Sequence, residues 1–70
     1  MKKNQPGYSV KSVEKSLPPK GMQEGEWHCY ILIRGNQEIK GVRFDTLKAV
    51  KKHARELAET INTRNGWTTV

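Results

Sequence analysis

Large apolar residues are concentrated between Trp27 and Ile61, and the period with which they recur changes within that stretch. The run WHCYILIR, residues 27–34, is rich in aromatic and β-branched residues, a composition that favours a β-strand. The polar segment GNQE and the run IKGVRF follow it, which indicates a turn and a second strand. The pattern therefore predicts an antiparallel β-hairpin over residues 27–44.

The register of this hairpin determines which side chains share a face of the sheet. A two-residue turn at Gly35-Asn36 pairs Arg34 with Gln37 and places Trp27 opposite Phe44. A four-residue turn keeps the same faces, because the register shifts by an even number, whereas a three-residue turn exchanges them. We expect the more apolar face to be buried and the other face to be open. The expected buried face is Trp27, Cys29, Ile31, Ile33, Val42 and Phe44, and the open face is His28, Tyr30, Leu32, Arg34, Ile39 and Arg43.

After the hairpin the apolar period becomes that of a helix. Six apolar residues recur at spacings of three, four, three, one and three, which places them on one helical face. Asp45 or Thr46 can cap the first turn, and Asn65-Gly66 is a natural end, because glycine readily adopts the left-handed conformation. Trp67, just beyond, can fold back onto the hairpin or the helix end. The helical face consists of Leu47, Val50, Ala54, Leu57, Ala58 and Ile61.

These elements predict an α+β fold for the 70-residue chain. We expect two layers, an antiparallel β-hairpin or three-stranded sheet packed against one C-terminal helix, because the apolar helix face needs an apolar sheet face. The core domain covers residues 27–67. Residues 1–26 are expected to be mostly flexible, with an edge strand possible over 8–16 and a proline- and glycine-containing loop over 17–26.

Basic residues are unevenly distributed along the chain. The formal net charge is +6, and residues 34–55 alone carry seven basic and two acidic residues, a net charge of +5. Such a concentration favours a polyanion such as nucleic acid, an anionic membrane surface or an acidic protein. Solubility is the alternative explanation, since small domains often carry a charge of this size.

Within the predicted helix the charges oppose the helix dipole, with bases in the first half and acids in the second. Lys48, Lys51, Lys52 and Arg55 are spaced as i, i+3, i+4 and i+7, on a face opposite or beside the apolar one. The total penalty is below about 1 kcal/mol, because only Lys48 lies in the first turn. The arrangement therefore does not demand a function, although a phosphate against the helix start would make it a binding site.

The residue pattern favours a non-enzymatic protein without a metal or cofactor. His28 and Cys29 are adjacent in a strand, so their side chains point to opposite faces and cannot form a catalytic pair. Together with His53 they lack a recognised zinc spacing. A single cysteine excludes an internal disulfide, and no apolar run is long enough for a membrane span. We expect a soluble, cytoplasmic protein.

The stretch from Trp27 to Ile61 resembles AP2-type domains and the amino-terminal arm-binding domains of tyrosine-type phage integrases. Their pattern is a strand with tryptophan, a turn, Gly-x-x-Phe-x-Thr, and a helix with alanines and bases. The resemblance covers about half of the chain and implies a three-stranded sheet lying in the major groove of duplex DNA, in a phage or mobile-element protein. The matching residues are Trp27, Gly41, Phe44, Thr46, Ala49 and Ala54.

A second resemblance is to double-stranded-RNA-binding domains, in which basic residues at the start of the last helix meet phosphates. Lys48, Lys51 and Lys52 are near that position.

We therefore expect a small basic protein that binds duplex nucleic acid, with DNA favoured, mainly through phosphate contacts. The alternative is a protein-interaction module or small inhibitor, homodimeric or monomeric, docking on an acidic partner through an apolar patch of Tyr30, Leu32 and Ile39. The expected nucleic-acid contacts are Lys48, Lys51, Lys52 and Arg55 on the helix, and Tyr30, Arg34, Lys40 and Arg43 on the sheet.

Overall fold

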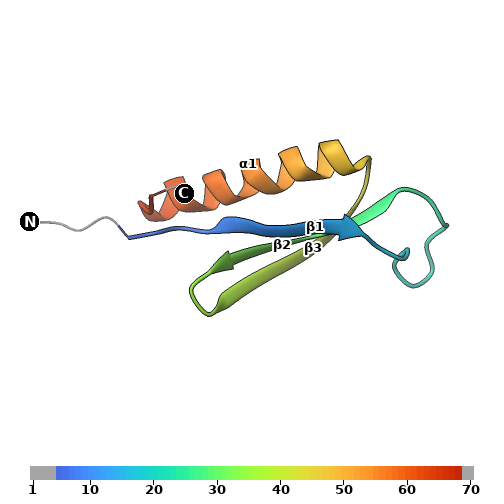
Figure 1. The fold of residues 1–70 in the computed structure, drawn as a ribbon, viewed down its shortest axis with the longest axis horizontal. Helices are drawn as coiled ribbons and strands as arrows, with labels where there is room; N and C mark the ends of the chain where they lie inside the picture. Colours follow the sequence, from blue (N-terminus) through green and yellow to red (C-terminus); the bar gives the residue numbers. More distant parts are fainter. Residues whose placement is uncertain (1–4, 69–70) are drawn as a thin grey trace, which may run out of the picture.

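The computed structural model describes residues 5–68 and has three strands followed by one helix (Figure 1). The strands are β1 (Ser9–Lys15), β2 (Trp27–Arg34) and β3 (Gln37–Phe44), and the helix is α1 (Leu47–Asn65). The sheet is antiparallel in the order β1-β2-β3, and α1 lies against β1 and β2. The predicted α+β fold is thereby confirmed, in its three-stranded form.

The β2–β3 hairpin has the register expected from a two-residue turn. Trp27 pairs with Phe44 and Arg34 pairs with Gln37, so Gly35 and Asn36 form the turn. Gly35 has a φ of 59° whereas Asn36 has a negative φ, the combination found in type II′ turns with glycine first. The turn therefore sets which side chains share a face, as the sequence predicted.

The helix covers the opposite face from the one predicted to be buried. Tyr30 is 8% exposed and Leu32 is fully buried under α1, whereas Val42 and Phe44 on the other face are 45% and 62% exposed. The expectation that the Trp27 face forms the core is thus wrong. The remaining members of the expected core are each half-buried, namely Trp27, Cys29, Ile31 and Ile33.

Small residues and the N-terminal strand explain this choice of face. Gly41 leaves room for the Tyr30 ring, since a Cβ on Gly41 would overlap the ring atoms. Ala54 is fully buried in the helix surface that faces the sheet, where a small side chain permits close approach. Val13 of β1 pairs with Tyr30 and adds to the same face. The covered face is therefore completed by residues outside the hairpin.

The core is small and centred between α1 and β2. Leu32, Val50 and Ala54 have no exposed surface, and Tyr8, Tyr30 and Ala58 are nearly as deeply buried. Leu57 and Ile61 of the predicted helical face pack at the margin, while Leu47 is 41% exposed. The partly buried residues around this core are Val13, Ile39, Leu57, Ile61 and Trp67.

Both helix ends follow from local sequence chemistry. The Thr46 hydroxyl accepts a hydrogen bond from the Ala49 amide at 3.2 Å, which selects Thr46 over Asp45 as the N-cap. Gly66 ends the helix in the left-handed conformation with a φ of 71°. Trp67 then turns back, its amide donating to the Asn62 carbonyl at 2.8 Å and its ring lying 6.1 Å from that of Tyr8.

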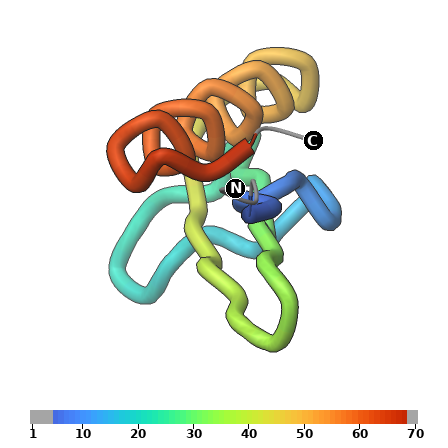
Figure 2. The backbone as a smooth tube through the Cα atoms, turned by 90° about the vertical axis from the view of Figure 1, so that its left-hand side faces the viewer, coloured from blue at the N-terminus to red at the C-terminus, as the bar shows by residue number. Residues whose placement is uncertain are grey.

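The segment before β1 is attached to the helix end (Figure 2). The fully buried Asn62 side chain accepts a hydrogen bond from the Tyr8 amide at 2.7 Å and donates one to the Tyr8 carbonyl at 3.0 Å. Pro6 forms a parallel bridge with Thr68. Of the segment 1–26 expected to be mostly flexible, residues 1–4 lie outside the described residues. Gln5, Gly7 and Tyr8 are hydrogen-bonded to Thr68 and Asn62, and β1 is paired with β2.

Candidate nucleic-acid interface

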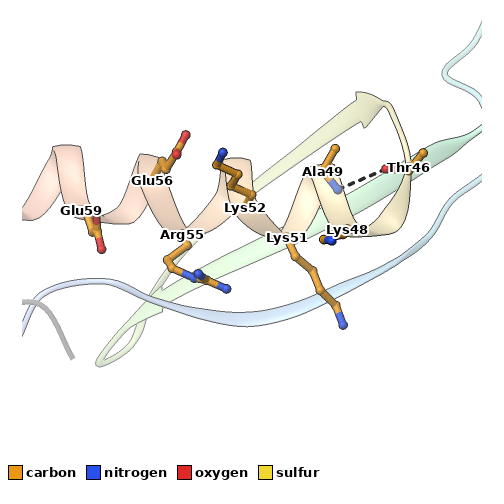
Figure 3. A pocket seen from close by; sticks show the side chains of 8 residues that line it. All are labelled: Thr46, Lys48, Ala49, Lys51, Lys52, Arg55, Glu56 and Glu59. Carbon is orange, nitrogen blue, oxygen red and sulfur yellow. Dashed lines mark hydrogen bonds between the residues drawn. The ribbon is translucent and has the colours of Figure 1, made fainter.

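Four basic side chains occupy the solvent-facing surface of α1. Lys48, Lys51, Lys52 and Arg55 are all exposed, on the side of the helix away from the buried Val50. Lys51 and Arg55 extend to one side of the helix axis and Lys52 to the other (Figure 3). We call these four residues the basic helix face. The structure thus places the helix residues of the predicted site together on one accessible surface.

Two glutamates border the basic helix face, but neither forms an ion pair with its bases. Within residues 5–68 the structure has a single ion pair, between Lys11 and Glu38, so none of the four bases is paired with a described carboxylate. Glu56 and Glu59 mark the end of the surface toward the C-terminus (Figure 3). A shallow, open hollow of about 630 Å³ lies between these side chains.

The first-turn amides of the helix attract an anion less than the basic side chains do. The first turn of α1 contains no acidic residue, which leaves the positive end of the dipole uncompensated within the helix. Asp45, however, lies just before the cap, where its carboxylate accepts a hydrogen bond from the Thr46 amide at 2.8 Å. The Asp45 carboxylate would repel an anion that approaches the first-turn amides. We therefore expect the lysine and arginine side chains, rather than these amides, to contact phosphate.

Arg34 has a structural role at the opposite end of the sheet. Its Nε donates to the Pro6 carbonyl at 2.9 Å, and one terminal nitrogen donates to the Gln5 side chain at 3.2 Å. The guanidinium carbon lies 3.7 Å from the ring centroid of Trp67, a cation–π contact. Arg34 therefore joins the two terminal segments, and these contacts use two of its five N–H donors and one face of its guanidinium group.

Tyr30 does not lie on an open sheet face, which corrects the prediction that it contacts nucleic acid there. Its ring is buried between sheet and helix and meets the His53 ring edge-on at 5.5 Å. His28 is also buried, with its Nδ1 2.8 Å from the Asp45 carbonyl oxygen. These aromatic side chains are part of the packing and cannot stack on bases.

The two remaining predicted contacts lie on different faces of the sheet. Lys40 pairs with Ile31 and so shares the face that points away from α1. Arg43 pairs with His28 and shares the helix side, close in sequence to the connection into α1. Both side chains are exposed. The concentrated charge of residues 34–55 is therefore divided by the fold, and only Arg43 can add to the basic helix face.

The apolar patch expected to bind a protein partner is largely buried, and the exposed apolar surface lies on the other face of the sheet. Leu32 has no exposed surface and Tyr30 little, so neither can be the centre of an interface. The accessible apolar surface is instead the opposite sheet face, which includes Val42 and Phe44. The alternation along β2 and β3 predicts which side chains share each face, but it does not predict which face the helix covers.

Among residues 5–68, no group of three histidine, cysteine, aspartate or glutamate side chains is arranged to hold a metal ion. In the same part of the chain, no helix has the length and apolar character needed to cross a membrane. Comparison with known proteins gives no matching family model, no similar curated protein and no similar solved structure.

Proposed function

We propose that this protein binds duplex nucleic acid through phosphate contacts made by the basic helix face. The observation that carries the proposal is the presence of four exposed bases on one helix surface, none paired with an acid within residues 5–68. Exposed lysine and arginine side chains at helical spacing can follow a phosphate backbone and release its counterions. Arg43 is the nearest candidate for a fifth contact.

The chemistry of this surface favours binding with little sequence preference. Phosphate contacts position a protein on a duplex but carry no information about the bases. The described helix α1 has no phenylalanine, tyrosine or tryptophan for stacking, and no asparagine or glutamine for reading adenine lies between Lys48 and Arg55. The expected interaction is therefore electrostatic, with affinity that falls steeply as salt rises.

The mode of binding differs from the one implied by the resemblance to AP2-type and phage-integrase domains. Those domains present a sheet to the major groove, but half of the side chains on the open face of this sheet are apolar, and its charges include two glutamates. Its bases are Lys40 and Lys11, and Lys11 is paired with Glu38 at 3.1 Å. The second resemblance, to double-stranded-RNA-binding domains, implies phosphate contacts at the start of the last helix, so duplex RNA must be tested beside DNA.

A binding titration with charge-reversed variants tests the proposal. Fluorescently labelled duplex DNA, duplex RNA and single strands are titrated by anisotropy at several salt concentrations. Four phosphate contacts predict a slope of log K against log salt of about −3.6 for duplex DNA. The double variant Lys48→Glu/Lys52→Glu should lower the affinity at least tenfold and bring the slope to about −1.8 or flatter.

The matched control reverses two exposed lysines away from the basic helix face. Lys20→Glu/Lys40→Glu makes the same change in net charge, in the loop after β1 and on the sheet face that points away from α1. It should weaken binding much less than Lys48→Glu/Lys52→Glu. Equal weakening by both variants, or unchanged affinity of the helix variant, would contradict the proposal. Sequence-blind binding that disappears by physiological salt would favour the alternative, a module that docks on an acidic protein.

A further inference from the structure

One face of the sheet is apolar and has no covering element among residues 5–68. The helix lies on the other side of the sheet (Figures 1 and 2). Val42 and Phe44 on the uncovered side are 45% and 62% exposed, a degree unusual for large apolar residues arranged side by side. We call this surface the open sheet face. Its apolar members are Trp27, Cys29, Ile31, Ile33, Val42 and Phe44.

The loop between β1 and β2 extends the apolar surface at one end. Trp27 is held by a hydrogen bond from its indole nitrogen to the Gln23 carbonyl at 2.8 Å, and its ring lies 5.2 Å from that of Phe44. Met22 is 54% exposed and borders a hollow of about 360 Å³ together with these two rings. The apolar surface therefore runs from the loop along the length of β2.

The charges on the open sheet face are balanced, unlike those of the whole chain. Lys11 and Glu38 form an ion pair at 3.1 Å, and Lys40 and Glu14 share the same side of the sheet through their pairing with β2. Two lysines and two glutamates sum to zero, although the chain carries +6. A polyanion gains little on a neutral surface, whereas a second copy can set its glutamates against these lysines.

The edges of the sheet do not favour strand addition. β1 has a bulge between Val10 and Ser12, and the β3 edge carries Lys40 and Arg43. Bulges and charged residues are features that protect edge strands from pairing with another chain. Association of two copies would therefore occur between sheet faces, about 10 Å apart, rather than edge to edge.

We propose that two copies of this chain associate through their open sheet faces. Strands of seven or eight residues in a three-stranded sheet give a face of roughly 26 Å by 14 Å. Two such faces have a flat area of roughly 700 Å² in total, below the roughly 1,200 Å² of a stable interface, so the dimer should be weak and reversible. The two basic helix faces would lie on opposite outer surfaces, farther apart than the Debye length of about 8–10 Å, and would repel each other little. This inference does not depend on the proposed function.

Sedimentation equilibrium over a wide concentration range tests the association. The wild-type chain should change from the mass of one chain to that of two as concentration rises. Val42→Lys places a like charge on both copies at an exposed position, so it should keep the chain monomeric at least tenfold further in concentration. Leu47→Lys is the matched control, because Leu47 is similarly exposed, at 41%, but lies at the start of α1. This control should dimerise like the wild type, and circular dichroism should show all three chains folded.

Cys29 provides a second measurement, because it lies on the open sheet face and is the chain's single cysteine. A short bis-maleimide should cross-link the wild type at Cys29 but not Val42→Lys. A Cys29→Ser/Lys20→Cys variant, with its thiol moved to the exposed loop, should also fail to cross-link. A wild type that stays monomeric, or equal dimerisation of Val42→Lys, would overturn the proposal. So would a monomeric chain whose tryptophan fluorescence shifts with phosphatidylcholine–phosphatidylglycerol vesicles, which would assign the face to a lipid surface.

Discussion

The two faces of the sheet differ less in their apolar content than in what lies opposite them. The covered face includes Tyr30 and Leu32, and the open face includes Ile31 and Ile33 from the same strand. Gly41 on the neighbouring strand leaves room for the Tyr30 ring on the covered face, whereas on the open face the Trp27 and Phe44 rings make a tilted contact with each other. The comparison shows that apolar count alone does not select the face that becomes the core. Space for a large ring and completion by a third strand also decide it.

The largest expected effect comes from truncating neighbouring residues on opposite faces of β2. Leu32→Ala leaves a cavity at a position with no exposed surface and should lower the free energy of unfolding by about 3 kcal/mol. Ile33→Ala, on the half-buried open side, should cost only about 1 kcal/mol. Urea denaturation at low protein concentration measures both. Equal losses would mean that the faces do not differ in burial.

A smaller effect is expected from filling the space above Gly41. In Gly41→Ala the added methyl group overlaps the Tyr30 ring, which has little freedom to move, so stability should fall by about 2 kcal/mol. In a Tyr30→Ala background the same substitution should cost much less, since the overlapping ring is gone. A thermodynamic cycle of the four proteins measures the coupling. Additive losses would show that Gly41 does not select the covered face.

The smallest effect is expected on the open sheet face. Phe44→Ser removes the contact with Trp27 from a residue that is 62% exposed, so the isolated chain should lose about 0.5–1 kcal/mol. If two copies associate through this face, the loss should grow with protein concentration, because the wild type alone gains stability from dimerisation. Thermal unfolding at low and high concentration separates the two contributions. A loss of 3 kcal/mol in dilute solution would show that Phe44 belongs to the core.

Much of the local structure was predictable because it depends on neighbours in sequence. The Gly35-Asn36 turn set the register, and Thr46 and Gly66 bound the helix through short-range hydrogen bonds and backbone conformation. The exposure of Lys48 and its neighbouring bases followed from helical periodicity. The roles of Arg34 and Tyr30 were not predictable in this way, because their partners, Trp67 and Gly41, come from other elements.

The sequence by itself determined the hairpin, the helix and the basic surface of that helix, and it left the turn length and the strand over 8–16 open. Alternation along a strand predicts which side chains share a face, since their direction repeats every two residues. Only the tertiary structure decided which of the two faces the helix covers. That choice depends on contacts far apart in sequence, such as the two hydrogen bonds between Asn62 and Tyr8 and the pairing of Val13 with Tyr30. Because α1 covers the Tyr30 face, the basic helix face and the apolar open sheet face lie on opposite sides of one small domain.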